Sequence, residues 1–374
     1  MARLEFAATV RWGVAFVCAC ALAPSGCLGN GGSDVPSRVK GDTATVYSSA
    51  SRHGASAVVA SAVMAGERRA LAEAGGHAGG LRIRRRELPA TDDTSEHPWD
   101  PAVVSENAHR AADDPSAIAY LGELDYGASA VSLPITNDAG LLQVSPGDGL
   151  TSLTQWPPGR PRAGPERYYP SDERTFVRLG PTDLQEAEYL LERVRASGAK
   201  RLAVVFDGDI YGRELVGQIL ARARRDGPEP VAAEEYRGKP DESLDLAGRL
   251  AEAHPDAVIC ALVAGRGTAR LLGEIDTALP AAPLFATSGM LAGRRGVAIP
   301  AGRERIEAIG PALSPQRAGY RAMRLVLDAV EQGQRNRRRV VSAALRLAPS
   351  ADDARLAVYR PGADGRFERV GVAR

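Results

Sequence analysis

The sequence is poor in aromatic residues, in lysine and in any surplus of charge. Aromatic residues make up 5% of its 374 residues, and only three of its 47 cationic residues are lysine. With 46 acidic residues against those 47, the net charge is +1. This balance leaves no basic surplus for holding nucleic acid or an anionic membrane by bulk charge. We therefore expect no nucleic-acid partner.

Cysteine and histidine are scarce as well, with four and five residues. Beyond residue 27 the only cysteine is Cys260, inside the apolar run AVICALV, so that part of the chain has no second thiol for an internal disulfide. No Cys/His pattern has metal-ligand spacing, and the G-x-S-x-G pattern of many hydrolases is absent. We expect no catalytic residues, no metal and no cofactor, and we interpret Cys260 as a buried small hydrophobic residue.

A short apolar run near the N-terminus predicts export. Residues 12–23 are apolar, Arg3 and Arg11 precede them, and the sequence PSGC (24–27) follows. Twelve residues are too few for a transmembrane helix, which needs about 20. The basic start, the short apolar core and the small residues at its end are typical of a secretory signal.

The small residues directly before Cys27 are similar to a bacterial lipobox, whose cysteine becomes lipid-modified and N-terminal after cleavage. We expect residues 1–26 to be a lipoprotein signal peptide, Cys27 to be the lipid anchor and residues 27–42 to be a flexible tether. The protein would then lie on the outer face of the cell membrane or in the periplasm, attached to the membrane through the lipid only. Cys20 is an alternative anchor. An ordinary secretory signal with an unmodified cysteine is a further alternative.

From residue 44 onward, helical periodicity alternates with short apolar runs. Repeated βαβ units of this kind form parallel sheets covered on both faces, so the pattern predicts an α/β fold. The length favours two lobes, since a single core rarely grows beyond about 250–300 residues. The pattern predicts helices at 57–74, 102–112, 127–138, 183–197, 213–225 and 267–279, and strands at 81–88, 117–121, 141–144, 201–206, 255–263 and 283–287.

The loops after the predicted strands are the expected ligand site, because ligands in such sheets bind at the carboxyl ends of the strands. These loops cover residues 49–54, 122–127, 145–150, 207–212, 263–267 and 287–290. Residues 155–174 are rich in Pro, Gly and Arg and are predicted to form an exposed loop.

Four segments carry a family resemblance: YLGELDYGASAVSLPITNDAGLLQVSP (120–146), TFVRLGPTDLQEAEYLLERVRASGAKRLAVVFDGDIYGREL (175–215), PDAVICALVAG (255–265) and AGYRAMRLVLDAVEQG (318–333). In this order they resemble the type I periplasmic binding proteins, in the branch of the leucine/isoleucine/valine-binding receptors of ABC importers. The similarity covers most of residues 44–360. The family has a longer segment before the helix that matches 318–331, whereas Ser314-Pro315 runs almost directly into that helix here.

The resemblance implies two doubly wound, Rossmann-like lobes with parallel sheets, which close on a small-molecule ligand. Three crossings would join the lobes near 174–180, 304–312 and 345–352. Lobe 1 would comprise residues 43–175 and 306–346, and lobe 2 residues 176–305 and 347–374. The implied partners are a small-molecule ligand and the subunits of an ABC permease, and the protein itself would be a monomer.

The resemblance also places the ligand contacts of lobe 1. Tyr126 stands where the family commonly has a ligand-binding serine, and Gly149 stands where a threonine is usual. The N–H group of Gly127 could receive a ligand carboxylate at the start of a helix. Gly147 lies in the Ser-Pro turn of this lobe. Asp148 would either repel a ligand carboxylate or point to solvent.

In lobe 2, the resemblance makes Tyr211 the aromatic ligand contact. Ala264 stands where another aromatic residue is usual, and Ser288 where amino-acid receptors have a glutamate for the ammonium group. Arg52, in the first strand–helix loop, could bind a carboxylate or lie in solvent. We expect a cleft lined by Tyr126, Gly147 and Gly149 on one side and Tyr211 and Ser288 on the other.

These substitutions predict that the protein does not bind Leu, Ile or Val tightly, because a zwitterion needs donors for its carboxylate and an anion for its ammonium group. The leading hypothesis is a lipid-anchored solute-binding protein of an ABC importer that takes a small polar or amino-acid-like ligand. The alternative is a sensory or protein-interaction lipoprotein on the same fold, with a degenerate cleft.

Overall fold

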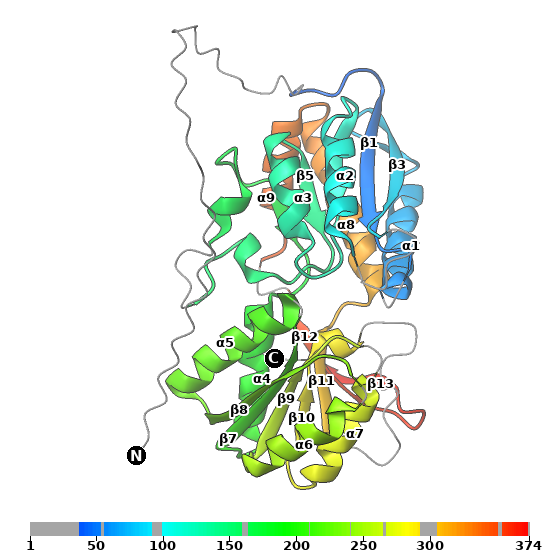
Figure 1. Ribbon diagram of the computed structural model, residues 1–374. Helices are drawn as coiled ribbons and strands as arrows, with labels where there is room; N and C mark the ends of the chain where they lie inside the picture. Colours follow the sequence, from blue (N-terminus) through cyan, green and yellow to red (C-terminus); the bar gives the residue numbers. More distant parts are fainter. Residues whose placement is uncertain are drawn as a thin grey trace, which may run out of the picture. The chain divides into compact units, whose positions relative to one another are not determined.

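Alternating strands and helices build two separate sheets in the computed structural model, which describes residues 37–53, 56–91, 99–158, 164–208, 210–239, 241–264, 267–291, 305–350 and 354–372. All of these residues belong to one unit, Val35–Arg374. Each sheet has helices on both faces (Figure 1), and we call the two sheets with their helices lobe 1 and lobe 2. This arrangement confirms the predicted fold class.

The sheet of lobe 1 has the strand order β2-β3-β1-β4-β5-β6. Its strands are β1 (Thr43–Ala50), β2 (His77–Ala78), β3 (Leu81–Pro89), β4 (Ala117–Leu121), β5 (Leu142–Ser145) and β6 (Phe176–Arg178). Strands β3, β1, β4, β5 and β6 run parallel, and the short β2 pairs antiparallel with β3 at the edge. Consequently, the carboxyl ends of β1, β4 and β5 meet at one edge of the sheet.

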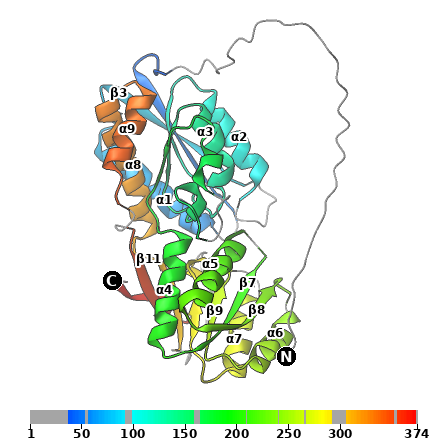
Figure 2. The ribbon, with the colours of Figure 1, turned by 90° about the vertical axis from the view of Figure 1, so that its left-hand side faces the viewer.

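Two layers of helices cover this sheet (Figure 2). The helices α1 (Ala57–Glu73), α8 (Pro315–Gly333) and α9 (Arg337–Leu347) pack against one face, and α2 (Pro101–Ala112) and α3 (Ser129–Asp138) pack against the other. Side chains alternate along β1, so Val46 lies in the core under α8 while Tyr47 lies in the core under α2. Helix α3 forms where the sequence predicted a helix, although Pro134 lies inside it.

A close backbone contact joins α1 to α8. A Cβ atom on Gly66 would lie 1.9 Å from the carbonyl oxygen of Gln316, and one on Gly319 would lie 2.0 Å from the carbonyl oxygen of Val63. Any side chain at either glycine would therefore push the two helices apart.

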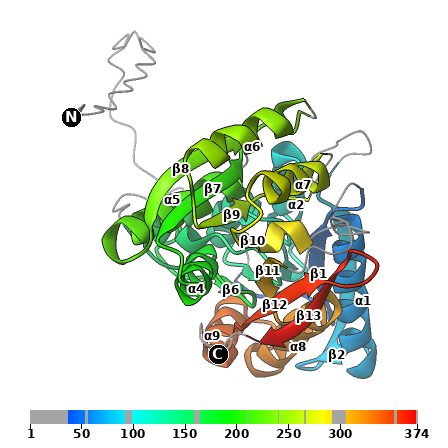
Figure 3. The ribbon, with the colours of Figure 1, turned by 90° about the horizontal axis from the view of Figure 1, so that it is seen from below.

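The sheet of lobe 2 has the strand order β13-β12-β11-β10-β9-β7-β8 (Figure 3). Its strands are β7 (Arg201–Asp207), β8 (Glu229–Tyr236), β9 (Ala257–Ala261), β10 (Leu284–Ala286), β11 (Ile306–Pro311), β12 (Leu356–Pro361) and β13 (Phe367–Val372). Helices α4 (Asp183–Ala196) and α5 (Ile210–Asp226) cover one face, and α6 (Glu242–Glu252) and α7 (Thr268–Ala278) cover the other. The five strands β7 to β11 are parallel to one another, whereas β12 pairs antiparallel with β11 and β13 pairs antiparallel with β12.

The chain passes between the sheets in three places: at Leu179–Thr182, at Ala312–Ser314, and between the end of α9 at Leu347 and the start of β12 at Leu356. Two of the predicted lobe boundaries are therefore wrong by a few residues. Strand β6 pairs with β5 and belongs to lobe 1, although residues 176–178 were assigned to lobe 2. Strand β11 pairs with β10 and belongs to lobe 2, although residues 306–311 were assigned to lobe 1. The expectation that both sheets are parallel throughout is wrong at their edges, where β2, β12 and β13 pair antiparallel.

The predicted tether, 27–42, is too long at its C-terminal end. Val39 is buried in the core of lobe 1, and its N–H group donates to the carbonyl oxygen of Arg335 at 2.8 Å. The predicted exposed loop 155–174 is corrected in the same way, because Tyr168 and Tyr169 are buried against Leu133 and Phe176. In both places apolar side chains hold a polar stretch onto the lobe.

The interpretation of Cys260 as a buried residue is confirmed. It lies in β9 with no exposed surface, and burial raises the pKa of its thiol to about 12. Among the described residues, Cys260 is a free cysteine that forms no disulfide.

Candidate ligand-binding cleft

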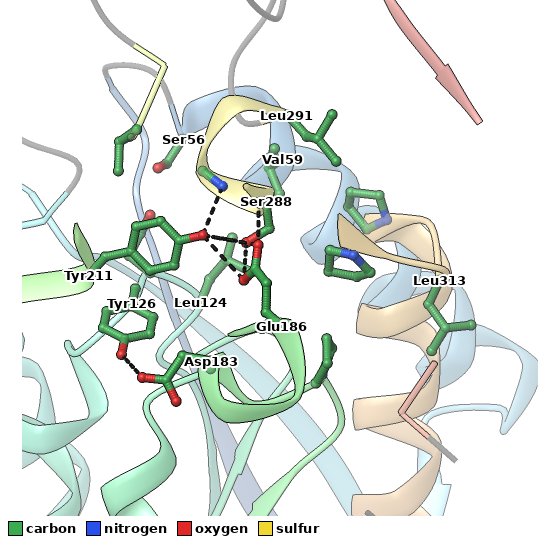
Figure 4. Close-up of a pocket in the computed structure, with 18 of the residues that line it drawn as sticks. Ser56, Val59, Leu124, Tyr126, Asp183, Glu186, Tyr211, Ser288, Leu291 and Leu313 are labelled. Carbon is green, nitrogen blue, oxygen red and sulfur yellow. Dashed lines mark hydrogen bonds between the residues drawn. The ribbon is translucent and has the colours of Figure 1, made fainter. Parts of the chain in front are cut away.

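A cavity of about 1050 Å³ lies where the loops after the strands of lobe 1 face the loops and helix ends of lobe 2. Leu124, Tyr126 and Gly149 line it from lobe 1, and Tyr211 and Ser288 line it from lobe 2. The close-up in Figure 4 shows polar side chains gathered at one part of the cavity and apolar ones at another. The cavity is thus large enough for a small organic molecule and has two chemically different parts.

The first polar group of the cavity is the pair Tyr126–Asp183, which joins the lobes. The Tyr126 hydroxyl donates to the Asp183 carboxylate at the start of α4. Asp183 is 1% exposed and also accepts from the N–H group of Thr151 at 3.0 Å. Burial raises the pKa of Tyr126 well above 10, and the nearby Asp183 charge adds to this, so Tyr126 remains a neutral donor.

The ring of Tyr126 also touches Tyr211 from α5. The two ring centroids are 4.9 Å apart, and the rings meet edge to face at 71°. Such a contact is a favourable geometry for two aromatic rings. It places both tyrosines on the same side of the cavity, where Figure 4 shows them next to each other.

The second polar group is centred on Glu186, in the first turn of α4. Its carboxylate accepts the Ser288 N–H group at 2.5 Å and the Ser288 hydroxyl at 2.9 Å, and it accepts the Tyr211 hydroxyl at 3.1 Å (Figure 4). Glu186 is 4% exposed, and burial raises its pKa to about 7. The hydrogen bonds from Ser288 oppose this rise, and the charge of Asp183 adds to it.

Asp125 is the third acidic group on the cavity wall, in the loop after β4. The Ser51 hydroxyl donates to it at 2.7 Å. Burial raises the pKa of Asp125 to about 6, hydrogen bonds from Ser56 and Ser51 oppose this, and the charge of Asp148 adds to it. The cavity wall thus holds several carboxylates in a poorly solvated place.

Asp148 does not point to solvent, and that alternative is wrong. Its side chain is fully buried and faces the start of α3. It accepts the N–H groups of Gly127 and Ser129, both at 2.9 Å, and that of Leu150 at 3.1 Å. The Ser145 hydroxyl accepts the N–H group of Asp148 at 2.8 Å and holds the turn in place. Consequently, the Gly127 N–H group that was expected to receive a ligand carboxylate already binds a carboxylate of this chain.

Five of the predicted site residues line the cavity together: Tyr126, Gly147, Gly149, Tyr211 and Ser288. The other four do not line it. Asp148 and Gly127 are buried behind it and bonded to each other, and Ala264 donates its N–H group to the carbonyl oxygen of Gly289. Arg52 is exposed, with its guanidinium 4.0 Å from Glu87. The predicted anchor Cys27 lies outside the described residues.

Glu186 was not among the predicted site residues, so the acidity of the cavity was not predicted either. Ser288 was interpreted as the loss of an anion, whereas the Glu186 carboxylate lies against that serine. The two residues are 102 positions apart. The available signal was the position of Glu186 one turn after the helix cap Thr182, beside the expected crossing between the lobes.

Two α/β lobes with a cavity between them, built on the carboxyl ends of parallel strands, define a two-lobed binding protein. The sequence profile of the family described as periplasmic binding protein matches residues 39–292, which is more than half of the chain. The chain belongs to this periplasmic binding protein family. The membership confirms the resemblance seen in the sequence, and it identifies a binding protein and not an enzyme.

Solved structures share this fold. The solute-binding protein of an ABC transporter from R. palustris, in complex with 4-hydroxybenzoate, has a TM-score of 0.67 and 14% identity over 89% of this chain and 97% of that chain. The leucine-binding protein LivK from Thermotoga maritima has a TM-score of 0.66 and 16% identity over 88% and 99%. The substrate-binding protein LivJ from Streptococcus pneumoniae, in complex with isoleucine, has a TM-score of 0.67 and 14% identity over 88% and 99%.

At these identities the similarity establishes the fold and not the ligand. No curated protein matches the chain. Among the described helices, none is long and apolar enough to cross a membrane. Within the same residues, no three His, Cys, Asp or Glu side chains are grouped as metal ligands would be.

Proposed function

We propose that the protein is the extracytoplasmic, lipid-anchored solute-binding component of an ABC importer and holds a small polar ligand in the cavity between its lobes. The observation that carries this proposal is the cavity itself. It lies at the strand ends of a periplasmic-binding-protein fold and is lined by side chains of both lobes. A ligand bound there would touch both lobes, as the hinge closure of periplasmic binding proteins around their ligands requires.

Native mass spectrometry of the purified protein tests the proposal. We expect a co-purifying small molecule, released by denaturation, and we expect the Tyr211→Phe variant to retain less of it, because this change removes a hydroxyl that contacts Glu186 and Ser288. The same molecule should enter wild-type cells faster than cells that lack the protein. A protein without any small-molecule adduct, together with unchanged uptake of candidate solutes, would contradict the proposal.

The lipid anchor is tested separately with a fatty-acid probe. We expect the wild-type protein to be labelled and the Cys27→Ser variant to lose the label, because the small residues before Cys27 are similar to a lipobox. The Cys20→Ser variant is the matched control and should retain the label. Equal labelling of wild type and Cys27→Ser would refute this anchor, and loss only in Cys20→Ser would move it to Cys20.

A second candidate function is a sensory or protein-interaction lipoprotein whose cleft has lost its ligand. The occupation of the Gly127 and Ser129 N–H groups by Asp148 favours it. The short crossing Ala312–Ser314, which leads directly into α8, favours it as well. A small molecule that binds in the cavity and whose uptake depends on the protein would exclude this alternative.

A further inference from the structure

The start of α3 is already occupied by an anion of the chain itself. The N-terminus of a helix attracts negative charge, because its first N–H groups have no partner within the helix. At α3 the Asp148 carboxylate takes the N–H groups of Gly127 and Ser129 at 2.9 Å each. The neighbours of Asp148 on both sides, Gly147 and Gly149, line the cavity. A ligand carboxylate at this place would have to displace a fully buried carboxylate.

On the cavity wall itself, the carboxylates of Glu186 and Asp125 have no cationic partner among the described residues. Glu186 accepts three donors, all of them neutral, from Ser288 and Tyr211. Asp125 accepts from Ser51, and hydrogen bonding from Ser56 also lowers its pKa. Glu186 is buried and Asp125 is half-buried. Because their partners are neutral, the cost of removing these carboxylates from water is uncompensated, and an incoming cation would offset it.

The arginines near the cavity do not compensate these two groups. The charge of Arg178 acts on Asp148 and Asp183 instead. Arg317, Arg366 and Arg369 line the cavity but are exposed. The guanidinium of Arg369 donates to the carbonyl oxygen of Ala312 at 3.0 Å.

The remaining lining suits an organic cation. The rings of Tyr126, Tyr211 and Trp99 line the cavity, and aromatic faces attract a cation when it is shielded from water. Apolar side chains lie opposite the tyrosines in Figure 4, among them Val59 and Leu313. These would contact the hydrocarbon part of a ligand.

We infer that the cavity selects a small organic amine that carries no carboxylate group, because the Asp148 carboxylate already holds the N–H groups at the start of α3. This inference rests on the proposed function, since it names the ligand class of the same cavity. The ammonium group would lie against Glu186, near the tyrosine rings, and the apolar part would extend toward Val59 and Leu313.

Three probes with the same branched carbon chain test this inference by calorimetric titration: 3-methylbutylamine, L-leucine and 4-methylpentanoate. They carry an ammonium group alone, both charged groups, and a carboxylate alone. We expect the amine to bind at least about tenfold more tightly than leucine, and 4-methylpentanoate not to bind, because one charge-assisted hydrogen bond is worth about a factor of ten or more.

Two variants locate the binding. Glu186→Gln should weaken amine binding about tenfold or more, because it removes the charge and keeps the size of the side chain. Glu106→Gln is the matched control, since Glu106 is exposed on α2 and paired with Arg110, outside the cavity. Equal loss in both variants, or no loss in Glu186→Gln, would overturn the inference.

The outcome also separates the ligand class from the proposed function. If leucine or 4-methylpentanoate binds more tightly than the amine, the inference is wrong while the protein remains a solute-binding protein. If none of the three probes binds, the inference is wrong; if native mass spectrometry also finds no adduct and the uptake of candidate solutes is unchanged, the proposed function is contradicted as well. If native mass spectrometry finds a carboxylate-bearing adduct, only the inference fails.

Discussion

The Glu186→Gln variant should be more stable than the wild-type protein at alkaline pH and not at acidic pH. Burial raises the pKa of Glu186 from 4.5 to about 7, so the folded chain binds a proton there more tightly than the unfolded chain does. Linkage then makes the free energy of unfolding fall as the pH rises from about 4.5 to about 7, and remain level above that. The stability that protonated Glu186 contributes is therefore fully present below about pH 4.5 and is lost as the pH rises to about 7.

The magnitude follows from that difference in pKa. At about 1.4 kcal/mol per unit of pKa, the ionised Glu186 costs about 3 kcal/mol of stability at pH 8. Glutamine removes this cost but loses part of the hydrogen bonding to Ser288 and Tyr211, at about 1 kcal/mol per bond. We expect a net gain of about 1–2 kcal/mol at pH 8, or about 2–6 °C in Tm. At pH 5 the carboxyl group of Glu186 is protonated, so the gain should vanish.

Thermal unfolding of both proteins at pH 5 and pH 8, followed by circular dichroism, measures this difference. The Glu106→Gln variant, with its exposed side chain, should show the same small effect at both pH values. A Tm difference between Glu186→Gln and wild type that is equal at pH 5 and pH 8 would refute the reasoning. It would mean that Glu186 is well solvated or paired with a cation in the folded protein.

Four more predictions concern the packing and the cavity. Gly319→Ala should destabilise the protein by about 1–3 kcal/mol in denaturant unfolding, because the new Cβ atom would meet the backbone of α1. Gly248→Ala is the control: its Cβ atom would have no neighbouring atom within 4 Å, so this variant should be neutral or slightly stabilising. Asp148→Ala should lower the Tm, because the Gly127 N–H group loses its anion, and added acetate should partly restore the Tm. If acetate raises the Tm of the variant no more than that of wild type, this prediction is wrong. L-Leucine, L-isoleucine and L-valine should show no micromolar Kd in calorimetry, since Asp148 already takes the Gly127 N–H group that was expected to receive a ligand carboxylate. Amine binding should strengthen from pH 6 to pH 8, as Glu186 ionises beside Asp183, Tyr211 and Ser288.

The sequence was sufficient for the elements that have a strong pattern. Helix α4 begins at Asp183, as predicted, because the capping box formed by Thr182 and Gln185 is a local signal in the sequence. Strand β8 was not predicted, since its sequence EPVAAEEY is polar and it lies at the edge of its sheet, where only part of each side chain is covered. Strand β11 was predicted to be a crossing between the lobes. Its pairing with β10 depends on how the sheet assembles, and the sequence of β11 alone does not show it.

The candidate site could be predicted only as far as the loops after the strands. Tyr126 and Tyr211 lie in loops that follow predicted strands, and the family resemblance singled them out within those loops; both line the cavity. The direction of the Asp148 side chain depends on the turn held by Ser145, and the contact of Glu186 with Ser288 depends on how α4 lies against the sheet. These are properties of tertiary packing, which a local pattern does not contain.

The isolation of Cys260 has a practical consequence for measuring how the lobes move. Its thiol is fully buried, and with a pKa of about 12 it remains protonated and slow to react with maleimide dyes at neutral pH. If the N-terminal cysteines are removed or replaced, two new cysteines placed at exposed positions such as Val58 on lobe 1 and Leu244 on lobe 2 would be the reactive ones. Single-molecule fluorescence between dyes at these two positions could then follow opening and closing of the cavity without first removing the native thiol from the core.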